Sequence, residues 1–358
     1  MLWSYSRRLA LVVLVLGLAA CQGAAFLRRP TATPTPAATL ELGDEVYTHP
    51  QGAFSLPLPA GWQVALEEPV RVRLTPGPHA TPSPYRWIEV AVINTAVALE
   101  DEALERFARQ FAQDVCAAAG PCEVRRVWLG SEGRAHADAQ VVTDEGEARW
   151  HFVYQRQGPV VFVLHIASDP SGVPDALVSA WWHYLRLDAT KAEGLPLYGY
   201  RRIYTLSLPH HPELELQEAV PVGWRVTRAR DVQAVEDLAY ALALSPDSRF
   251  GLLLYSGHQG HLALSDQDLR ASALATLHML FELEDKDFVI HTAHRDLDGR
   301  WLLLWEATPP GMRGVTRAEA FHDELVLFTG FAPSTLWAVA EPFFQELLTT
   351  FHPLPVER

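Results

Sequence analysis

Residues 59–64 read Pro-Ala-Gly-Trp-Gln-Val, and residues 221–226 read Pro-Val-Gly-Trp-Arg-Val, at an offset of 162 residues. Two further pairs of segments recur in the same order at nearly the same offset: Ala98–Leu104 with Ala263–Leu269, and Val160–Ile166 with Glu324–Gly330. Three landmarks in one order indicate a tandem duplication. The period is far too long for a solenoid repeat and suits a complete domain.

Each copy carries an apolar pattern of helical period after its Gly-Trp turn. In the first copy this pattern consists of Leu104, Phe107, Phe111 and Val115. In the second copy, Ser265 followed by Asp268 resembles a capping box and predicts the start of the matching helix. The apolar stripe of that helix consists of Leu269, Ala273, Leu277 and Leu280.

Apolar and β-branched runs around these helices predict strands in both copies. The runs are Arg71–Leu74, Trp87–Asn94, Ala148–Tyr154 and Val160–Ala167 in the first copy, and Trp301–Ala307 and Glu324–Gly330 in the second. Gln155–Pro159 predicts a hairpin turn. A final helix is expected at residues 174–187 and at 334–351, with a kink at Pro342. Strands clustered between two helices predict an α+β fold on antiparallel sheets.

The segment from Tyr47 to Trp62 resembles the opening of PsbP-like domains, in the pattern Tyr47-x-x-Pro-x-Gly-x-Phe54-Ser55-Leu56-x-Leu58-Pro59-Ala60-Gly61-Trp62. That family has an α/β/α sandwich fold and includes the extrinsic photosystem II protein and bacterial lipoproteins of unknown role. The order of elements fits both copies, although Leu214–Glu218 departs from the apolar opening strand. The resemblance implies a binding or assembly module and carries no catalytic residues to transfer.

We therefore expect two tandem α/β/α sandwich domains, each an antiparallel sheet flanked by two main helices. The expected boundaries are a lipoprotein signal peptide at 1–20, lipidated Cys21 with a Pro/Thr/Ala-rich linker at 21–44, a PsbP-like domain at 45–188, a linker at 189–201 and a second PsbP-like domain at 202–358. The composition of the first linker predicts an extended, semi-rigid spacer.

The first twenty-one residues have the pattern of a lipoprotein signal peptide. Arg7-Arg8 precede the apolar run Leu9–Leu18, and Leu18-Ala19-Ala20-Cys21 forms a lipobox. The run is about ten residues long, well short of the roughly twenty that span a bilayer. We predict diacylglycerol on Cys21, acyl chains such as palmitate as the anchor, and a location outside the cytoplasm. The alternatives are a retained membrane helix and cleavage after Ala20 without lipidation.

The charge balance and the cysteines narrow the functional classes. The formal net charge is -14, which disfavours binding to nucleic acid, and no basic stripe with interleaved aromatics occurs. Cys116 and Cys122 remain after lipidation of Cys21, and the Gly120-Pro121 turn between them lets the chain reverse. An oxidising compartment favours a disulfide between these two residues. The alternative is two buried thiols that pack as small hydrophobes.

Catalytic and metal signatures are weak or missing in the sequence. G-x-S-x-G, H-E-x-x-H and G-x-G-x-x-G do not occur, and neither lysine follows a glycine as a phosphate-binding loop requires. His258 and His261 have a metal-like spacing, with Asp266 and Asp268 downstream, but a site needs three or four converging ligands. His210-His211, with Glu213, is weaker still, because adjacent residues point apart on an extended chain. We therefore predict no catalytic residue, no metal and no cofactor.

The tryptophans allow two interpretations each, and an acidic run allows one. Trp62 and Trp224 are expected as core anchors, with ligand stacking as the alternative. Of Trp181-Trp182, one ring is expected to be buried and the other to reach the rim, unless both are buried between the domains. Glu100-Asp101-Glu102 is expected as the acidic first turn of a helix.

Together these observations favour a membrane-anchored, non-catalytic binding or assembly module for an envelope complex. A small-molecule or metal-binding lipoprotein that uses a cleft between the domains is the first alternative. A cryptic hydrolase is the second, and it requires histidines and carboxylates gathered in one pocket.

Overall fold

A computed structural model describes most of the chain. The described residues are 42–80, 85–131, 133–143, 146–170, 175–208, 214–228, 238–258, 265–281, 284–296, 299–309, 311–321 and 324–355. The expected signal peptide, Cys21, His210, His211, Glu213 and His261 lie outside these ranges. No helix in the described part combines the length and the apolar character needed to cross a membrane.

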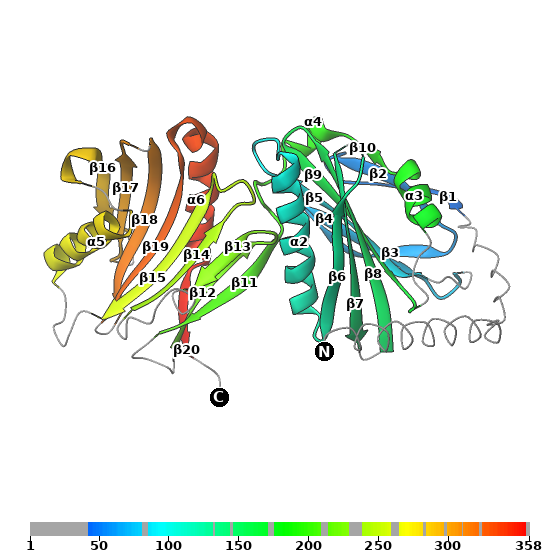
Figure 1. The fold of residues 1–358 in the computed structure, drawn as a ribbon, viewed down its shortest axis with the longest axis horizontal. Helices are drawn as coiled ribbons and strands as arrows, with labels where there is room; N and C mark the ends of the chain where they lie inside the picture. Colours follow the sequence, from blue (N-terminus) through cyan, green and yellow to red (C-terminus); the bar gives the residue numbers. More distant parts are fainter. Residues whose placement is uncertain are drawn as a thin grey trace, which may run out of the picture. The chain divides into compact units, whose positions relative to one another are not determined.

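Two seven-stranded antiparallel sheets dominate the fold, and they have the same strand order (Figure 1). The first sheet has the order β3 (Trp62–Glu68), β4 (Arg71–Pro76), β5 (Tyr85–Asn94), β9 (Val160–Ser168), β8 (Gly146–Gln157), β7 (Arg134–Thr143), β6 (Cys122–Leu129). The second has the order β13 (Arg225–Arg228), β14 (Leu238–Leu244), β15 (Gly251–His258), β19 (Glu324–Pro333), β18 (Met312–Phe321), β17 (Trp301–Ala307), β16 (Phe288–Arg295). The α+β fold class is confirmed, and the two similar sheets are consistent with a duplicated unit.

One long helix follows the third strand of each sheet. In the first copy it is α2 (Asp101–Ala118), which contacts β6, β7 and β8. In the second it is α5 (Asp266–Leu280), which contacts β18 and β19. Both helices were predicted from their apolar stripes. In the first copy, Leu104, Phe107 and Phe111 of the stripe are buried, as the prediction requires. Glu100 to Glu102 form the acidic start of α2, as expected.

A small three-stranded sheet accompanies each large one. The first joins β1 (Leu42–Thr48), β2 (Phe54–Pro59) and β10 (Arg186–Leu187), and the second joins β11 (Arg201–Ser207), β12 (Leu214–Pro221) and β20 (His352–Pro355). The segment Leu214–Glu218, where the second copy departs from the family pattern, therefore lies in a strand. A core around Trp181 joins β1 and β2 to the face of the first sheet that faces away from α2.

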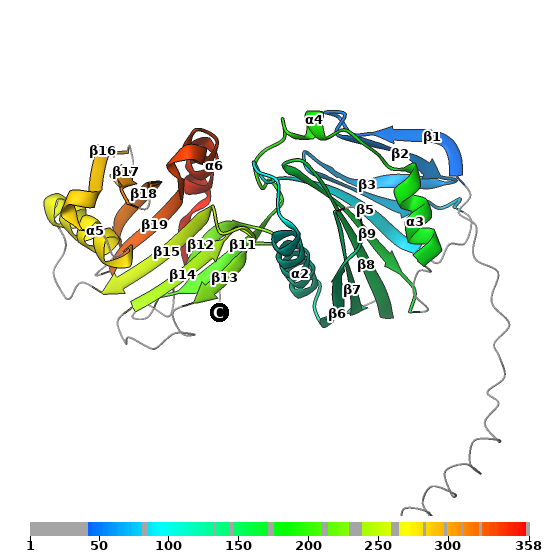
Figure 2. The same ribbon diagram turned by 45° about the horizontal axis from the view of Figure 1, so that its top comes forward.

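The closing helices differ from expectation in one place. The first, α3 (Asp175–Tyr184), lies near β1 and β3 (Figures 1 and 2) and is shorter than the predicted 174–187. It ends early because Arg186 and Leu187 leave the helix to pair with Ser55 and Phe54 of β2. The second, α6 (Trp337–Thr350), follows a short 3-10 turn, η3 (Ser334–Leu336), and contains Pro342. Another 3-10 turn, η2 (Asp285–Asp287), precedes β16.

The expected linker 189–201 is packed against the protein. It begins with α4 (Ala189–Ala192), which Asp188 caps through a hydrogen bond from the Lys191 amide. Asn94 of β5 donates hydrogen bonds to the carbonyl oxygens of Glu193 and Leu195, at 2.9 and 3.1 Å. One buried apolar cluster also contains side chains of both copies. The linker is thus an ordered connection between the copies.

A disulfide joins Cys116, in the last turn of α2, to Cys122, the first residue of β6. Six positions separate the two residues. A loop this short constrains the unfolded chain less than a long one, so the bond acts as a local link between helix and strand.

Candidate functional site

The residues singled out in the sequence do not meet in one place. His258 lies at the end of β15, and its partner His261 is outside the described ranges. No group of three or more His, Cys, Asp or Glu side chains that could hold a metal ion occurs within the described residues. His258 therefore takes part in no metal centre among the described residues.

The tryptophans serve mainly as core anchors. Trp62 and Trp224 are buried, at 7% and 0% exposed. Trp181 is 1% exposed within the core of the first copy, whereas Trp182 is half-buried, with the Arg134 guanidinium 5.7 Å from its ring centroid. The adjacent tryptophans thus divide as their helical spacing predicts, one buried and one at the rim.

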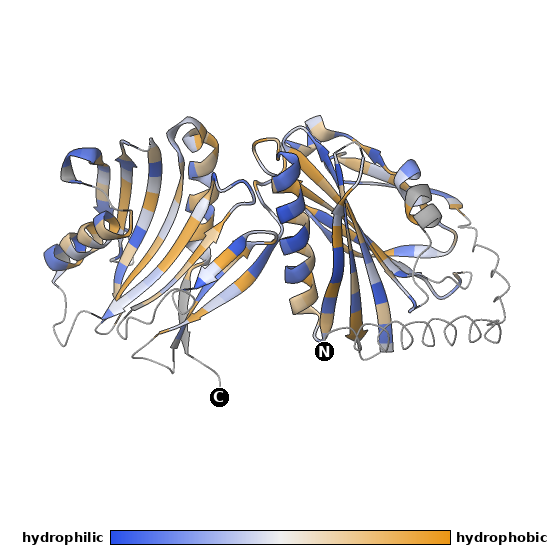
Figure 3. Ribbon diagram, viewed as in Figure 1, coloured by the Kyte–Doolittle hydropathy of each residue, from blue (hydrophilic) through white to orange (hydrophobic). Residues whose placement is uncertain are grey.

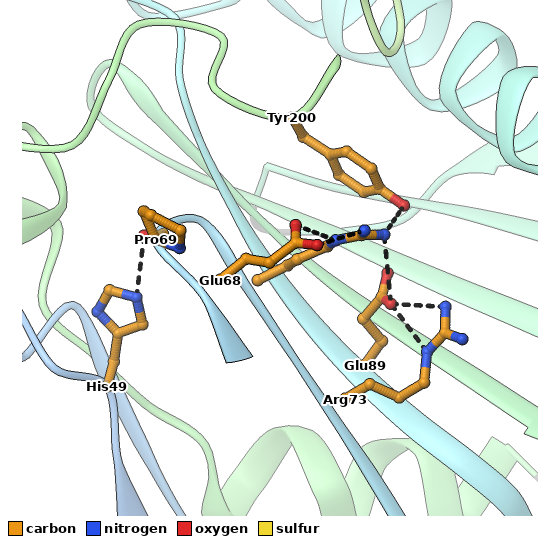
Figure 4. A network of polar contacts seen from close by, with 7 residues as sticks. His49, Glu68, Pro69, Arg73, Glu89 and Tyr200 are labelled. Carbon is orange, nitrogen blue, oxygen red and sulfur yellow. Dashed lines mark hydrogen bonds and ion pairs between the residues drawn. The ribbon is translucent and has the colours of Figure 1, made fainter. Parts of the chain in front are cut away.

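In a polar network centred on β4 and β5, the charged groups bond to one another (Figure 4). Arg71 donates two hydrogen bonds to Glu68, at 2.6 and 2.8 Å, and a third to the Tyr200 hydroxyl at 2.9 Å. Arg73 donates two to one oxygen of buried Glu89, at 3.0 and 2.8 Å. Two arginines meet two glutamates, so the network has no net charge to offer a ligand. The network links neighbouring strands and fixes Tyr200, which lies in the connection between the two copies.

A second polar region covers the face of β6–β8 that points away from α2. On β7, Ala135, Ala137 and Ala139 are buried towards the helix, while alternate side chains point the other way. Figure 3 shows this alternation as hydrophilic and hydrophobic bands along the strands. We call this surface the polar face; its members are Glu123, Arg125, Arg126, Trp128, His136, Asp138, Gln140, Val142, Glu147, Arg149 and His151.

A β-bulge gives the polar face two consecutive arginines. Val124 pairs with Ala139 and Arg126 pairs with Asp138, so Arg125 is the extra residue in β6. Neighbouring residues of a regular strand point to opposite faces, but a bulge re-aims side chains. Arg125 and Arg126 consequently line the same pocket.

Asp138 is the negative centre of this region. It accepts a hydrogen bond from His151 Nδ1 at 2.5 Å and one from Arg126 at 3.3 Å. Burial opposes the ionisation of Asp138, but the hydrogen bonds and charges of His151 and Arg126 outweigh burial and lower the pKa of Asp138. Asp138 is therefore an ionised carboxylate whose negative charge is already balanced by Arg126 and His151.

The pocket itself has a volume of about 580 Å³. Its lining consists of Arg125, Arg126, Asp138, Ala139, Gln140, Arg149, His151 and Ser168. Arg125 contacts Glu123 and Gln140, both at 3.0 Å. Arg149 forms no ion pair within the part of the chain that the structure describes. A volume of this size suits a small molecule or a protruding group of a larger partner.

The second copy keeps the scaffold of this site but not the Arg–Asp–His cluster around Asp138. β16 has the same bulge, between Ile290 and Thr292. The pairs Gln157 with Val160 and Phe321 with Glu324 end the corresponding strand pairings and fix the correspondence of the sheets. By this register, Arg126, Asp138, His151 and Ser168 correspond to Thr292, Leu304, Val315 and Ala332. The fold does not require polar side chains at these positions.

The pocket gathers a serine, a histidine and an aspartate, as a hydrolase would need. Ser168, however, is only 1% exposed, and its hydroxyl is directed to the carbonyl oxygens of Arg149 and Asp169, at 3.4 and 3.3 Å. A nucleophilic serine must instead lie within hydrogen-bond reach of its base. The observed contacts of Ser168 are those of a structural residue.

A smaller cavity of about 150 Å³ lies where α2 meets the turns of the second copy. Its lining consists of Arg106, Arg109, Gln110, Gly223, Arg225, Ser245, Pro246 and Ser248. Typical ligand pockets occupy roughly 300–1,000 Å³. This cavity is thus a poor candidate for the ligand cleft between copies that the sequence left open.

Neither the family models nor the curated proteins compared with the chain match it. The solution structure of cyanobacterial PsbP (CyanoP) from Synechocystis sp. PCC 6803 is distantly similar over 43% of this chain and 94% of its own, at 13% identity and a TM-score of 0.32. A crystal structure from Bacteroides thetaiotaomicron VPI-5482 covers 48% of this chain and 55% of its own, at 10% identity and a TM-score of 0.27.

The apo structure of the immunity protein TplEi of T6SS from Pseudomonas aeruginosa covers 87% of this chain and 97% of its own, at 12% identity and a TM-score of 0.23. The PsbP-like resemblance is thus present as a distant structural similarity over part of the chain. At these values the likenesses assign neither a family nor an activity to it.

Proposed function

We propose that this chain is a lipid-anchored, extracytoplasmic binding or assembly module, built from two tandem PsbP-like domains, with no catalytic activity. Its recognition surface is the polar face of β6–β8, and its partner is a protein of an envelope or membrane complex. The lipobox at Cys21 supports the anchor, and the acidic net charge of -14 argues against nucleic acid as the partner.

One observation carries the choice of surface. Arg149 on the polar face has no ion pair within the described residues, whereas its counterpart in the second copy, Arg313, is neutralised by Glu306, and Leu304 and Val315 stand where the first copy has Asp138 and His151. Charge that the fold does not need, on an accessible sheet face, is typical of a surface selected for recognition. The Ser168 hydroxyl donates to backbone carbonyl oxygens and forms no hydrogen bond with His151 among the described residues, which supports binding over hydrolysis.

Capture of partners from gently solubilised membranes tests the proposal. Val142 lies on the polar face outside the pocket and is 47% exposed, so Val142→Glu should repel an acidic partner without disturbing the pocket. The matched control is Val289→Glu on β16, at a residue 53% exposed. We expect wild type and the control to recover the same protein, and Val142→Glu to lose most of it.

The anchor is tested in the same cells. Cys21→Ala should move the protein from the membrane fraction to a soluble extracytoplasmic fraction. Recovery of the protein alone under several mild conditions, or equal capture by both valine variants, would refute the proposed surface.

A further inference from the structure

We infer that the pocket over β6–β9 binds a small, highly polar oxyanion, a compound that carries phosphate or several carboxylates. The inference rests on the proposed function, because it names a ligand for the same polar face. It depends on three features of the pocket: a positive charge without an ion pair, guanidinium groups already held in place, and a lining of mostly polar and charged residues.

The first feature is charge. The eight lining residues include three arginines and one aspartate; Arg125 is paired with Glu123 and Arg126 with Asp138, so one positive charge remains, with His151 counted as neutral. The negative charge of Asp138 is neutralised by Arg126 and His151, and Arg149 has no ion pair within the described residues. The formal charge of the whole chain is -14, so this excess is a local reversal of sign. Such a reversal in a concave site concentrates anions.

The second feature is preorganisation. The Arg126 guanidinium lies 3.8 Å from the ring centroid of Trp128 and contacts Asp138. Arg125 is held between Glu123 and Gln140. Guanidinium groups bind carboxylate and phosphate through paired hydrogen bonds, and groups that are already oriented lose less entropy when the anion arrives.

The third feature is the polarity of the walls. Ala139 is the only apolar residue among the eight, whereas typical small-molecule pockets are lined mostly by apolar side chains. A ligand with a large apolar body would desolvate the arginines without pairing them, which is costly. The occupant must therefore be polar over most of its surface. It reaches the site either as a free solute or as the headgroup of a lipid.

The second copy supplies an internal comparison. Thr292 stands where the first copy has Arg126, and Arg313, which corresponds to Arg149, is paired with Glu306 at 2.8 Å. The same bulged sheet thus exists with the counterpart of Arg149 neutralised by an ion pair. Arg126→Thr is a substitution that this fold already accommodates at the equivalent position.

The test is calorimetric titration of the purified full chain in neutral detergent. The probes are inorganic phosphate, citrate, and phosphatidylglycerol dissolved in micelles of the same detergent, with micelle-dissolved phosphatidylcholine, which has no net charge, as the reference. We expect saturable binding of phosphate or citrate, weakened roughly tenfold or more in Arg126→Thr/Arg149→Ala, because charge-assisted hydrogen bonds are lost. Arg313→Ala is the matched control and should bind as wild type does. Arg126→Lys/Arg149→Lys keeps the charge and should bind with intermediate affinity.

Each outcome decides the inference. Binding only to phosphatidylglycerol, lost in the double variant, supports the same chemistry with a lipid as its source. No saturable binding of any probe, or equal binding by wild type and the double variant, overturns it. Capture of a protein partner that still depends on Val142 would then show that only the anion inference, and not the proposed function, had failed.

Discussion

Two groups of arginines in the first sheet differ in what their guanidinium groups contact. Arg71 and Arg73 each meet a glutamate, and Glu89 between them is 1% exposed. Arg149 has no such partner in the described part of the chain. All three are arginines within strands of one sheet, so the sequence could not separate them. Only their contacts in the folded chain show that Arg71 and Arg73 are structural and that Arg149 is available to a ligand.

The polar network centred on β4 and β5 predicts a pH-dependent loss of stability. The hydrogen bonds from Arg71 lower the pKa of Glu68, so its ion pair stabilises the fold above about pH 4.5 and this contribution is lost as pH falls through the lowered pKa. Glu68→Gln should reduce the free energy of unfolding at pH 7 by at most about 1 kcal/mol, since the pair is partly exposed. Urea titrations should show the variant and wild type converging near pH 3.

The control for this experiment is Glu102→Gln on α2, where the carboxylate is 92% exposed and 3.7 Å from Arg106. It should change the free energy of unfolding by less than about 0.5 kcal/mol. A difference between Glu68→Gln and wild type that stays constant down to pH 3 would contradict the assigned ion pair.

Elements with a local signal could be predicted from the sequence. The stripe around Phe107, the capping serine at Ser265 and the hairpin at Gly158-Pro159 each lie within one stretch of chain. The pairing of β10 with β2 could not be predicted, because its two residues lie about 130 positions from their partners. The bulge at Arg125 escaped for the same reason: it exists only in the register between two strands. The polar face therefore appears only in the folded chain.

The two long helices begin differently, and this predicts unequal effects of removing the cap. The Ser265 side chain accepts a hydrogen bond from the Asp268 amide at the start of α5, whereas Glu100 makes no such bond at the start of α2. Ser265→Ala should cost about 1 kcal/mol of unfolding free energy, and Glu100→Ala only a few tenths. Denaturant titrations of both variants check this. A loss in Ser265→Ala as small as a few tenths of a kcal/mol would contradict the assigned cap of α5.

At the scale of the whole molecule, the duplicated Gly-Trp turn has taken different roles in its two copies. A Cβ on Gly61 would lie 2.7 Å from Cα of Ala80, within the first copy. A Cβ on Gly223 would lie 2.5 Å from Cε2 of Phe107, in α2 of the other copy. The Gly223 amide also donates to Asp114 of α2 at 2.9 Å. The Gly-Trp turn is thus local in the first copy and a contact between the copies in the second.

That contact predicts the effect of Gly223→Ala on the stability of the molecule. The residue has a φ of +90°, which a side chain disfavours by about 1 kcal/mol or more, and the new methyl group would press against Phe107, at roughly 1–3 kcal/mol. Gly120→Ala is the matched control, since its φ of +103° carries the same strain but no atom lies within 4 Å of its Cβ. Denaturant unfolding should show Gly223→Ala losing at least about 1 kcal/mol more than Gly120→Ala. Equal losses would mean that Gly223 serves only its own turn and that the packing of the copies does not depend on it.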